Sequence, residues 1–167
     1  MSLTIGGDSD DWKMFSRKSQ TGNQILFRSR TQVPEVHAYA SEHQMARLRC
    51  VLAASEIGPN GLPKTTRDFD AFEDSLLGAL EQANAEVYLV AVVTSEGNRD
   101  LFFAARDLDD LRAGIKAATN APTIQLQLAP FTDKEPFLKL LTLTPEMEKA
   151  AFVQGRAFGV PFGKPGR

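Results

Sequence analysis

Apolar and polar positions follow two different periods along the chain, and each period predicts a kind of element. Residues 47–54 alternate, with Leu48, Cys50 and Leu52 on one side, and residues 123–129 alternate in the same way. Each stretch therefore predicts a strand with one buried face. Residues 86–94 are almost continuously apolar, which is typical of a central strand covered on both faces.

Two helices and two hairpins are predicted between and around these strands. Apolar residues recur at helical spacing over residues 65–83, with Thr65 and Asp68 placed as a capping pair, and again after a second cap at Asp107. Turn-forming residues separate 12–17 from 24–30 and 86–94 from 99–106, so each pair predicts a hairpin.

The remaining stretches give weaker patterns. Pro34 interrupts the chain before a short extended piece at residues 35–40. Asp133 opens a short helical turn with Phe137, Leu138 and Leu141, and a further helix is expected over residues 144–154.

The order of these elements predicts an α+β fold. Strand, helix, hairpin, helix and strand give a ferredoxin-like β-α-β-β-α-β antiparallel sheet with helices on one face, plus an N-terminal β-hairpin and C-terminal helical additions. We expect a flexible N-terminus over 1–11, a single domain over 12–154 and an irregular tail over 155–167.

The second face of the sheet must be covered by another part of the protein or by a second chain. The hairpin or the C-terminal segment could supply this cover in a monomer, which we favour, and a second chain could supply it in a homodimer.

Composition narrows the class of protein. The chain has 167 residues, 43% of them hydrophobic and 24% charged, as in an ordinary globular domain. The formal net charge of -2 gives no general attraction for nucleic acid. The single cysteine and the lack of a long apolar run lead us to expect a cytoplasmic protein that does not enter a membrane.

The residues that commonly carry chemistry are scattered. His37, His43 and Cys50 lie on separate stretches, so we expect no metal site, and the two histidines are expected in loops. Cys50 lies on the apolar side of its strand and is expected in the core. Because neither glycine-rich phosphate-binding motif occurs, we expect no cofactor.

Charge is segregated between the predicted elements. Arginines, including Arg47 and Arg49, fall on strands, whereas most carboxylates fall on helices, so a basic sheet face could receive an acidic partner. Arg99, which begins a strand after a tight turn, could pair with Asp74 or another carboxylate, or bind a partner, and we favour the structural pair. The candidate binding residues are Arg99, Asp74, Arg47, Arg49 and Trp12.

Several motifs together resemble a known family. They are Gly61-Leu62-Pro63, Phe72-Glu73-Asp74-Ser75-Leu76 and the run from Thr94-Ser95-Glu96-Gly97-Asn98 to Arg99-Asp100-Leu101-Phe102-Phe103, with Trp12 and Phe15 before them and Leu143-Thr144-Pro145 after them. The chain resembles, over roughly residues 12 to 150, the domain-of-unknown-function family numbered 695. Ala104, Phe137 and Leu141 depart from the aromatic residues usual in that family. The resemblance implies kinship with the type B regulators of ribonuclease E activity, which act by binding an enzyme.

Two hypotheses for the function remain. The first is a non-catalytic binding or regulatory domain that acts through contact with a partner protein. The second is a small ligand-binding protein or enzyme with a pocket between the sheet and the added hairpin. A pocket with convergent polar groups would favour the second hypothesis, and a flat or apolar surface would favour the first.

Overall fold

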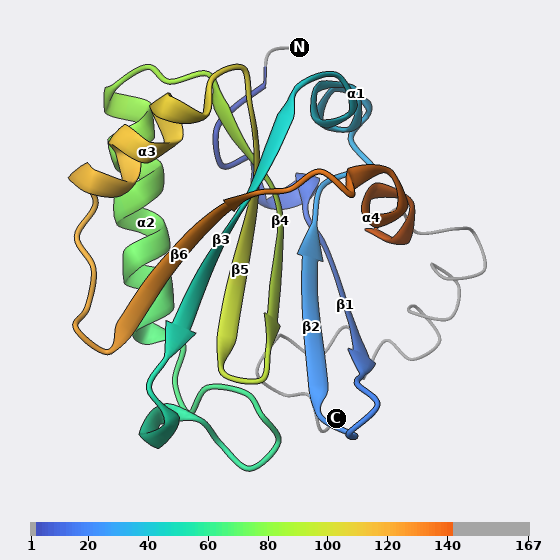
Figure 1. The fold of residues 1–167 in the computed structure, drawn as a ribbon. Coiled ribbons are helices and arrows are strands. Elements are labelled where there is room, and N and C mark those ends of the chain that lie inside the picture. Colours follow the sequence, from blue (N-terminus) through green and yellow to red (C-terminus); the bar gives the residue numbers. More distant parts are fainter. Residues whose placement is uncertain (1–2, 142–167) are drawn as a thin grey trace.

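The fold is a six-stranded antiparallel sheet with helices on both of its faces. The computed structural model describes residues 3–141 (Figure 1). The strands lie in the order β1-β2-β4-β5-β3-β6, so the α+β class is confirmed. The strands are β1 (Lys13–Lys18), β2 (Gln24–Ser29), β3 (Gln44–Leu52), β4 (Val87–Ser95), β5 (Asn98–Ala105) and β6 (Ile124–Pro130). The helices are α1 (Pro34–Glu42), α2 (Arg67–Gln82), α3 (Leu108–Ala117) and α4 (Lys134–Leu141), with 3-10 turns at Ser9–Asp11 and Ala54–Glu56.

The N-terminal hairpin widens the sheet instead of covering it. Both predicted hairpins are present, and β2 pairs with β4, with Arg28 opposite Val92. Of the two internal covers expected for the second face, the hairpin is therefore wrong, because its strands lie in the plane of the sheet. β1 becomes one edge of the sheet and β6 becomes the other.

α2 and α3 cover one face, which we call the front face. The apolar stripe of α2, including Phe69, Phe72 and Leu76, packs against the inward residues of β3, such as Leu48 and Cys50. These positions are the ones that the alternation and the helical spacing predicted. Asp107 caps α3 as predicted, since its side chain accepts a hydrogen bond from the Asp109 N–H.

α1 and α4 cover the opposite face, which we call the back face, as Figure 1 shows. Residues 35–40, predicted to be extended, belong instead to α1, where Pro34 lies in the first turn and Val36 and Ala40 are buried one turn apart. Proline is favourable in the first turn of a helix because the N–H it lacks has no partner there. On this face the aromatic residues Phe131 and Phe137 pack on Phe102 of β5.

The β4–β5 turn fixes the loop that precedes α2. Glu96 and Gly97 have φ values of 50° and 80°, as a tight two-residue hairpin turn requires. The Gly97 N–H donates to Gly61 O at 2.8 Å, and the Gly97 carbonyl accepts from the Leu52 N–H at 2.9 Å. A Cβ at position 97 would clash with Ile57, so glycine is needed there for its φ and for the close approach.

The N-terminal segment contacts the sheet. Arg30 is only 1% exposed, and its guanidinium donates to the carbonyls of Thr4, Ile5 and Leu89. Burial lowers the pKa of Arg30 to about 10. The Leu89 N–H also donates to the Ile5 carbonyl at 2.9 Å, so Ile5 is bonded to β4 and to Arg30, and Thr4 to Arg30, within the stretch expected to be a flexible N-terminus.

The helix expected over 144–154 and the irregular tail over 155–167 lie outside the described residues. Within residues 3–141, no helix has both the length and the apolar character needed to cross a bilayer.

Candidate functional site

A groove of about 410 Å³ opens on the front face, between the hairpin, the loop before α2 and the first turn of α2. It exists because α2 lies over the centre of the sheet while β1 and β2 extend beyond it. Leu26, Val92 and Thr94 line the groove from β2 and β4, and Met14 from β1. The loop before α2 contributes Asn60, Leu62 and Pro63.

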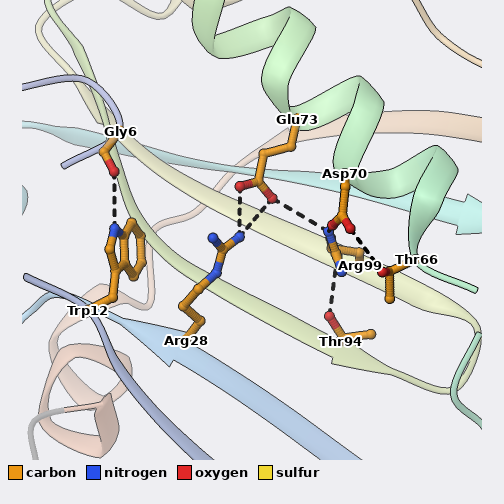
Figure 2. Close-up of polar contacts among 8 residues, drawn as sticks. All are labelled: Gly6, Trp12, Arg28, Thr66, Asp70, Glu73, Thr94 and Arg99. Carbon is orange, nitrogen blue, oxygen red and sulfur yellow. Dashed lines mark hydrogen bonds and ion pairs between the residues drawn. The ribbon is translucent and has the colours of Figure 1, made fainter. Parts of the chain in front are cut away.

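Two arginines and two carboxylates form a network at the α2 side of the groove (Figure 2). Arg28 Nη2 donates to both carboxylate oxygens of Glu73 at 2.7 Å. Arg99 Nη1 donates to Asp70 Oδ1 at 2.8 Å and lies 3.6 Å from Glu73 Oε1. Glu73 thus lies between two guanidinium groups, each from a different strand. Charge-assisted contacts of this kind hold both arginine side chains in fixed positions.

Neighbouring groups orient the Arg99 end of this network. Thr66 Oγ1 donates to Asp70 Oδ2 at 2.9 Å, so Asp70 is held from two sides. The guanidinium carbon of Arg99 lies 5.0 Å from the centre of the Phe69 ring, and its Nε lies 3.4 Å from Thr94 Oγ1. The guanidinium is therefore stacked on an aromatic face and bonded at its edges.

Trp12 supports the other end of the network. Its indole N–H donates to the Gly6 carbonyl at 3.0 Å (Figure 2). The guanidinium carbons of Arg28 and Arg30 lie 5.0 Å and 5.6 Å from its ring centre. Trp12 therefore links the N-terminal segment to the side chain of Arg28, although it does not line the groove.

The sequence of α2 explains why the acidic residues face the sheet. The buried positions Phe69, Phe72, Glu73, Leu76 and Leu80 form one helical stripe, and Glu73 lies within it. Glu73 and Asp70 are three residues apart and so lie on the same side of α2. The expected capping box does not form, because the helix begins after Thr66, whose side chain makes no capping hydrogen bond, while Thr65 Oγ1 accepts only from the Arg67 N–H.

Of the partners expected for Arg99, Asp74 or another carboxylate, the structure has other carboxylates. Arg99 lies in the groove, donates a hydrogen bond to Asp70 and forms a longer ion pair with Glu73. Asp74 is exposed and has no ion pair among residues 3–141. The two carboxylates closer to the sheet take the role that Asp74 was expected to have.

Arg47 and Arg49 lie on the back face, away from the groove. The alternation of β3 directs them opposite to Leu48 and Cys50. Arg49 donates two hydrogen bonds to Asp100, at 2.8 and 2.9 Å, and this bonding raises the pKa of Arg49. Arg47 Nε is buried and has no hydrogen-bond partner within residues 3–141. The five candidate residues therefore do not form one site: Arg99 and Trp12 belong to the groove region, and the others do not.

Three participants in the network, Glu73, Asp70 and Arg28, are not among the candidate binding residues that the sequence predicted. Glu73 is buried, with 10% of its side chain exposed. The helical spacing contained this signal, because position 73 falls four residues after Phe69 and three before Leu76.

Neither Cys50 nor the histidines line the groove, although Cys50 is the cross-strand neighbour of Arg99. Burial raises the pKa of the Cys50 thiol to about 12, as expected for a core residue. His37 lies within α1, contrary to the loop prediction, and His43 directly follows that helix. Among residues 3–141, no three His, Cys, Asp or Glu side chains are placed to hold a metal ion.

The described residues form an α+β fold with a polar network beside an apolar surface. The model of a family of unknown function, DUF695, matches residues 10–136, and the chain belongs to that family. Neither a curated protein nor a solved structure matches the chain.

Proposed function

We propose that this protein is a non-catalytic binding domain, and that the groove on the front face holds a segment of a partner protein. The observation that carries the proposal is the side-by-side placement of apolar surface and free guanidinium donors. Met14, at the rim of the groove, is 44% exposed, and Leu26, Leu62 and Val92 add apolar surface to the lining. Apolar surface surrounded by polar groups is the usual composition of a protein-protein interface.

Arg28 and Arg99 retain hydrogen-bonding capacity for a ligand. Arg28 uses only Nη2 for Glu73, and its Nε and Nη1 have no hydrogen-bond partner in the described part of the chain. Arg99 Nη2 likewise has no partner there. The matching partner group is an apolar side chain next to a carboxylate or another planar acceptor. Because Glu73 and Asp70 balance the two arginines, we expect recognition of shape and hydrogen bonds more than of net charge.

A small-molecule ligand is the second candidate, and the size of the groove favours it. About 410 Å³ falls within the roughly 300–1,000 Å³ range of small-ligand sites. The polar groups that line it, Thr66, Thr94 and Arg99, could fix the orientation of such a ligand.

The family kinship and the topology add further proposals. The suggested kinship with the type B regulators of ribonuclease E activity agrees with a role in protein contact in the cytoplasm, and it stays a prediction. We also propose that β3, α2, β4, β5, α3 and β6 form a ferredoxin-like unit. Their order in the sheet, β4-β5-β3-β6, is the support for this proposal.

Quantitative affinity capture with matched variants tests the binding proposal. Met14 and Leu140 are the two exposed large apolar residues of the described chain, at 44% and 40%, and they lie on β1 and α4. We expect Met14→Gln to reduce capture of a specific protein from the native lysate, and Leu140→Gln to leave it unchanged. Equal capture by wild type and Met14→Gln would contradict the proposal. A small molecule retained in native mass spectrometry by the wild type, and lost in Met14→Gln, would favour the second candidate.

A further inference from the structure

The two edges of the sheet differ in how they are protected from other strands. β1 carries Lys13, Arg17 and Lys18 among its six residues, and charges of this kind prevent pairing between sheet edges. β6, with the sequence IQLQLAP, carries no charge, and it lies at the opposite edge of the sheet (Figure 1). The β6 edge therefore lacks the usual protection along most of its length.

The hydrogen bonds at the two ends of β6 show which backbone groups point outward. The Thr123 carbonyl accepts from the Ala53 N–H, and the Phe131 N–H donates to the Met45 carbonyl. The backbone N–H and C=O groups of the odd-numbered residues of β6 therefore point toward β3. In an antiparallel strand, the N–H and C=O of one residue point to the same side and alternate residues point oppositely. The register of β6 on β3 is continuous, so the backbone N–H and C=O groups of the even-numbered residues point outward, away from β3.

Only two of these outward residues can accept a new strand. The Ile124 N–H already donates to the Ala121 carbonyl, and its own carbonyl accepts from Asn120 Nδ2. Pro130 has no N–H to donate. Leu126 and Leu128 remain, and no second strand pairs with them among residues 3–141.

We propose that β6 pairs with β6 of a second copy of this chain, antiparallel and around a two-fold axis at Gln127. This register sets Leu126 opposite Leu128 of the other copy and Leu128 opposite its Leu126. The two pairs form four backbone hydrogen bonds and use all the free donors and acceptors of Leu126 and Leu128. The sheet then runs continuously through both copies, as in a two-fold, self-complementary interface.

The sequence of β6 is compatible with pairing to β6 of a second copy. In this register Gln127 faces Gln127, whose neutral amides can donate and accept, and Gln125 faces Ala129. Pairing β1 with itself would instead bring lysine and arginine side chains close together. The leucine side chains are only partly buried against the front-face core, so a second strand would cover them further.

The register provides a matched pair of variants for the test. Gln125 and Gln127 are both exposed, and they lie two residues apart on the same side of β6. Gln127→Lys places like charges against each other at the axis, next to Arg49 on β3. Gln125→Lys places its charge opposite an alanine. Sedimentation of the full chain over a range of concentrations measures the outcome, with circular dichroism to check that each variant is folded.

We expect the wild type to approach twice 18.3 kDa as its concentration rises, and Gln125→Lys to behave in the same way. Gln127→Lys should stay at 18.3 kDa, and mixing it with Gln127→Glu should restore the dimer. A wild type that stays monomeric at every concentration overturns the proposal, as does a dimer that Gln127→Lys does not weaken or that Gln125→Lys weakens equally. If Gln127→Lys fails to fold, hydrogen exchange of the wild-type amides is measured instead. The proposal requires that exchange of the Leu126 and Leu128 amides becomes slower as the protein concentration rises.

Discussion

Arg28 Nη2 lies 2.7 Å from both carboxylate oxygens of Glu73, although 45 residues separate the two in sequence. Arg28 comes from the added hairpin and Glu73 from the helix over the centre of the sheet. The pair therefore connects the hairpin to α2 and determines the position of the guanidinium at the groove.

Removing Glu73 should destabilise the fold. Glu73→Ala leaves Arg28 and Arg99 without a shared carboxylate, and we expect a loss of about 1 to 3 kcal/mol, since the pair is partly solvated. Urea denaturation measures this loss. Asp74→Ala is the matched control, because Asp74 is the adjacent but exposed carboxylate, and it should have little effect. Equal losses in both variants would contradict a structural role for Glu73.

Arg99 is expected to matter more than a surface arginine. Arg99→Ala removes contacts to Asp70, Glu73 and the Phe69 ring, and should cost about 1 to 3 kcal/mol. The control is Arg106→Ala, which removes an ion pair with Glu86. Because Arg106 is largely exposed in that pair, the unfolding midpoint should change little. An Arg99→Ala protein as stable as the wild type would contradict a structural role for Arg99.

Cys50 should be unreactive in the folded state. Its thiol is buried and its pKa is raised to about 12, so the reactive thiolate is rare at pH 8. We expect labelling by a disulfide reagent to proceed only as the protein unfolds, and its rate to follow urea concentration. Rapid labelling in native buffer would place Cys50 outside the core.

Glu86 should contribute a pH-dependent term to stability. The hydrogen bond from Tyr39 Oη, at 2.7 Å, lowers the pKa of the Glu86 carboxyl below its usual 4.5, and Arg106 lowers it further. A lowered carboxyl pKa stabilises the fold above the unfolded pKa, and that contribution is lost as the pH falls through the folded pKa. Tyr39→Phe should raise the Glu86 pKa in an NMR titration. An unchanged pKa in this variant would mean that the bond does not form in solution.

Arg30 should hold the N-terminal segment on the sheet. Arg30→Gln removes donors to the carbonyls of Thr4 and Ile5. Hydrogen exchange of the Leu89 amide, which donates to the Ile5 carbonyl, should therefore become faster. Arg17→Gln, on the exposed edge strand, is the control and should leave that amide protected. Exchange of the Leu89 amide that is as slow in Arg30→Gln as in the wild type would show that residues 4 and 5 are held by other contacts.

Local patterns predicted much of the sheet but not the network. The Gly97 turn, the alternation of β3 and the apolar stripe of α2 are local signals, and each gave the correct element. α1 was missed because Pro34 was interpreted as a break, although proline also begins helices. The Arg28–Glu73 and Arg99–Asp70 pairs join residues 45 and 29 positions apart, and no local period encodes such contacts.

The placement of Arg47 and Arg49 illustrates a related limit. Alternation correctly set them opposite Leu48 and Cys50, but it could not show on which face a groove would form. The groove depends on how far the hairpin extends the sheet beyond α2, and this extension follows from the pairing of β2 with β4.

Site-specific photocrosslinking at the groove tests the binding proposal most directly. A photoreactive residue is introduced at Met14, on the groove rim, or at Leu140 on α4, and the protein is irradiated in its native cells. We expect a discrete crosslinked partner from position 14, its absence from position 140, and its loss when Arg28→Gln is added. The same partner from both positions, or from position 140 alone, would contradict the groove as the binding surface.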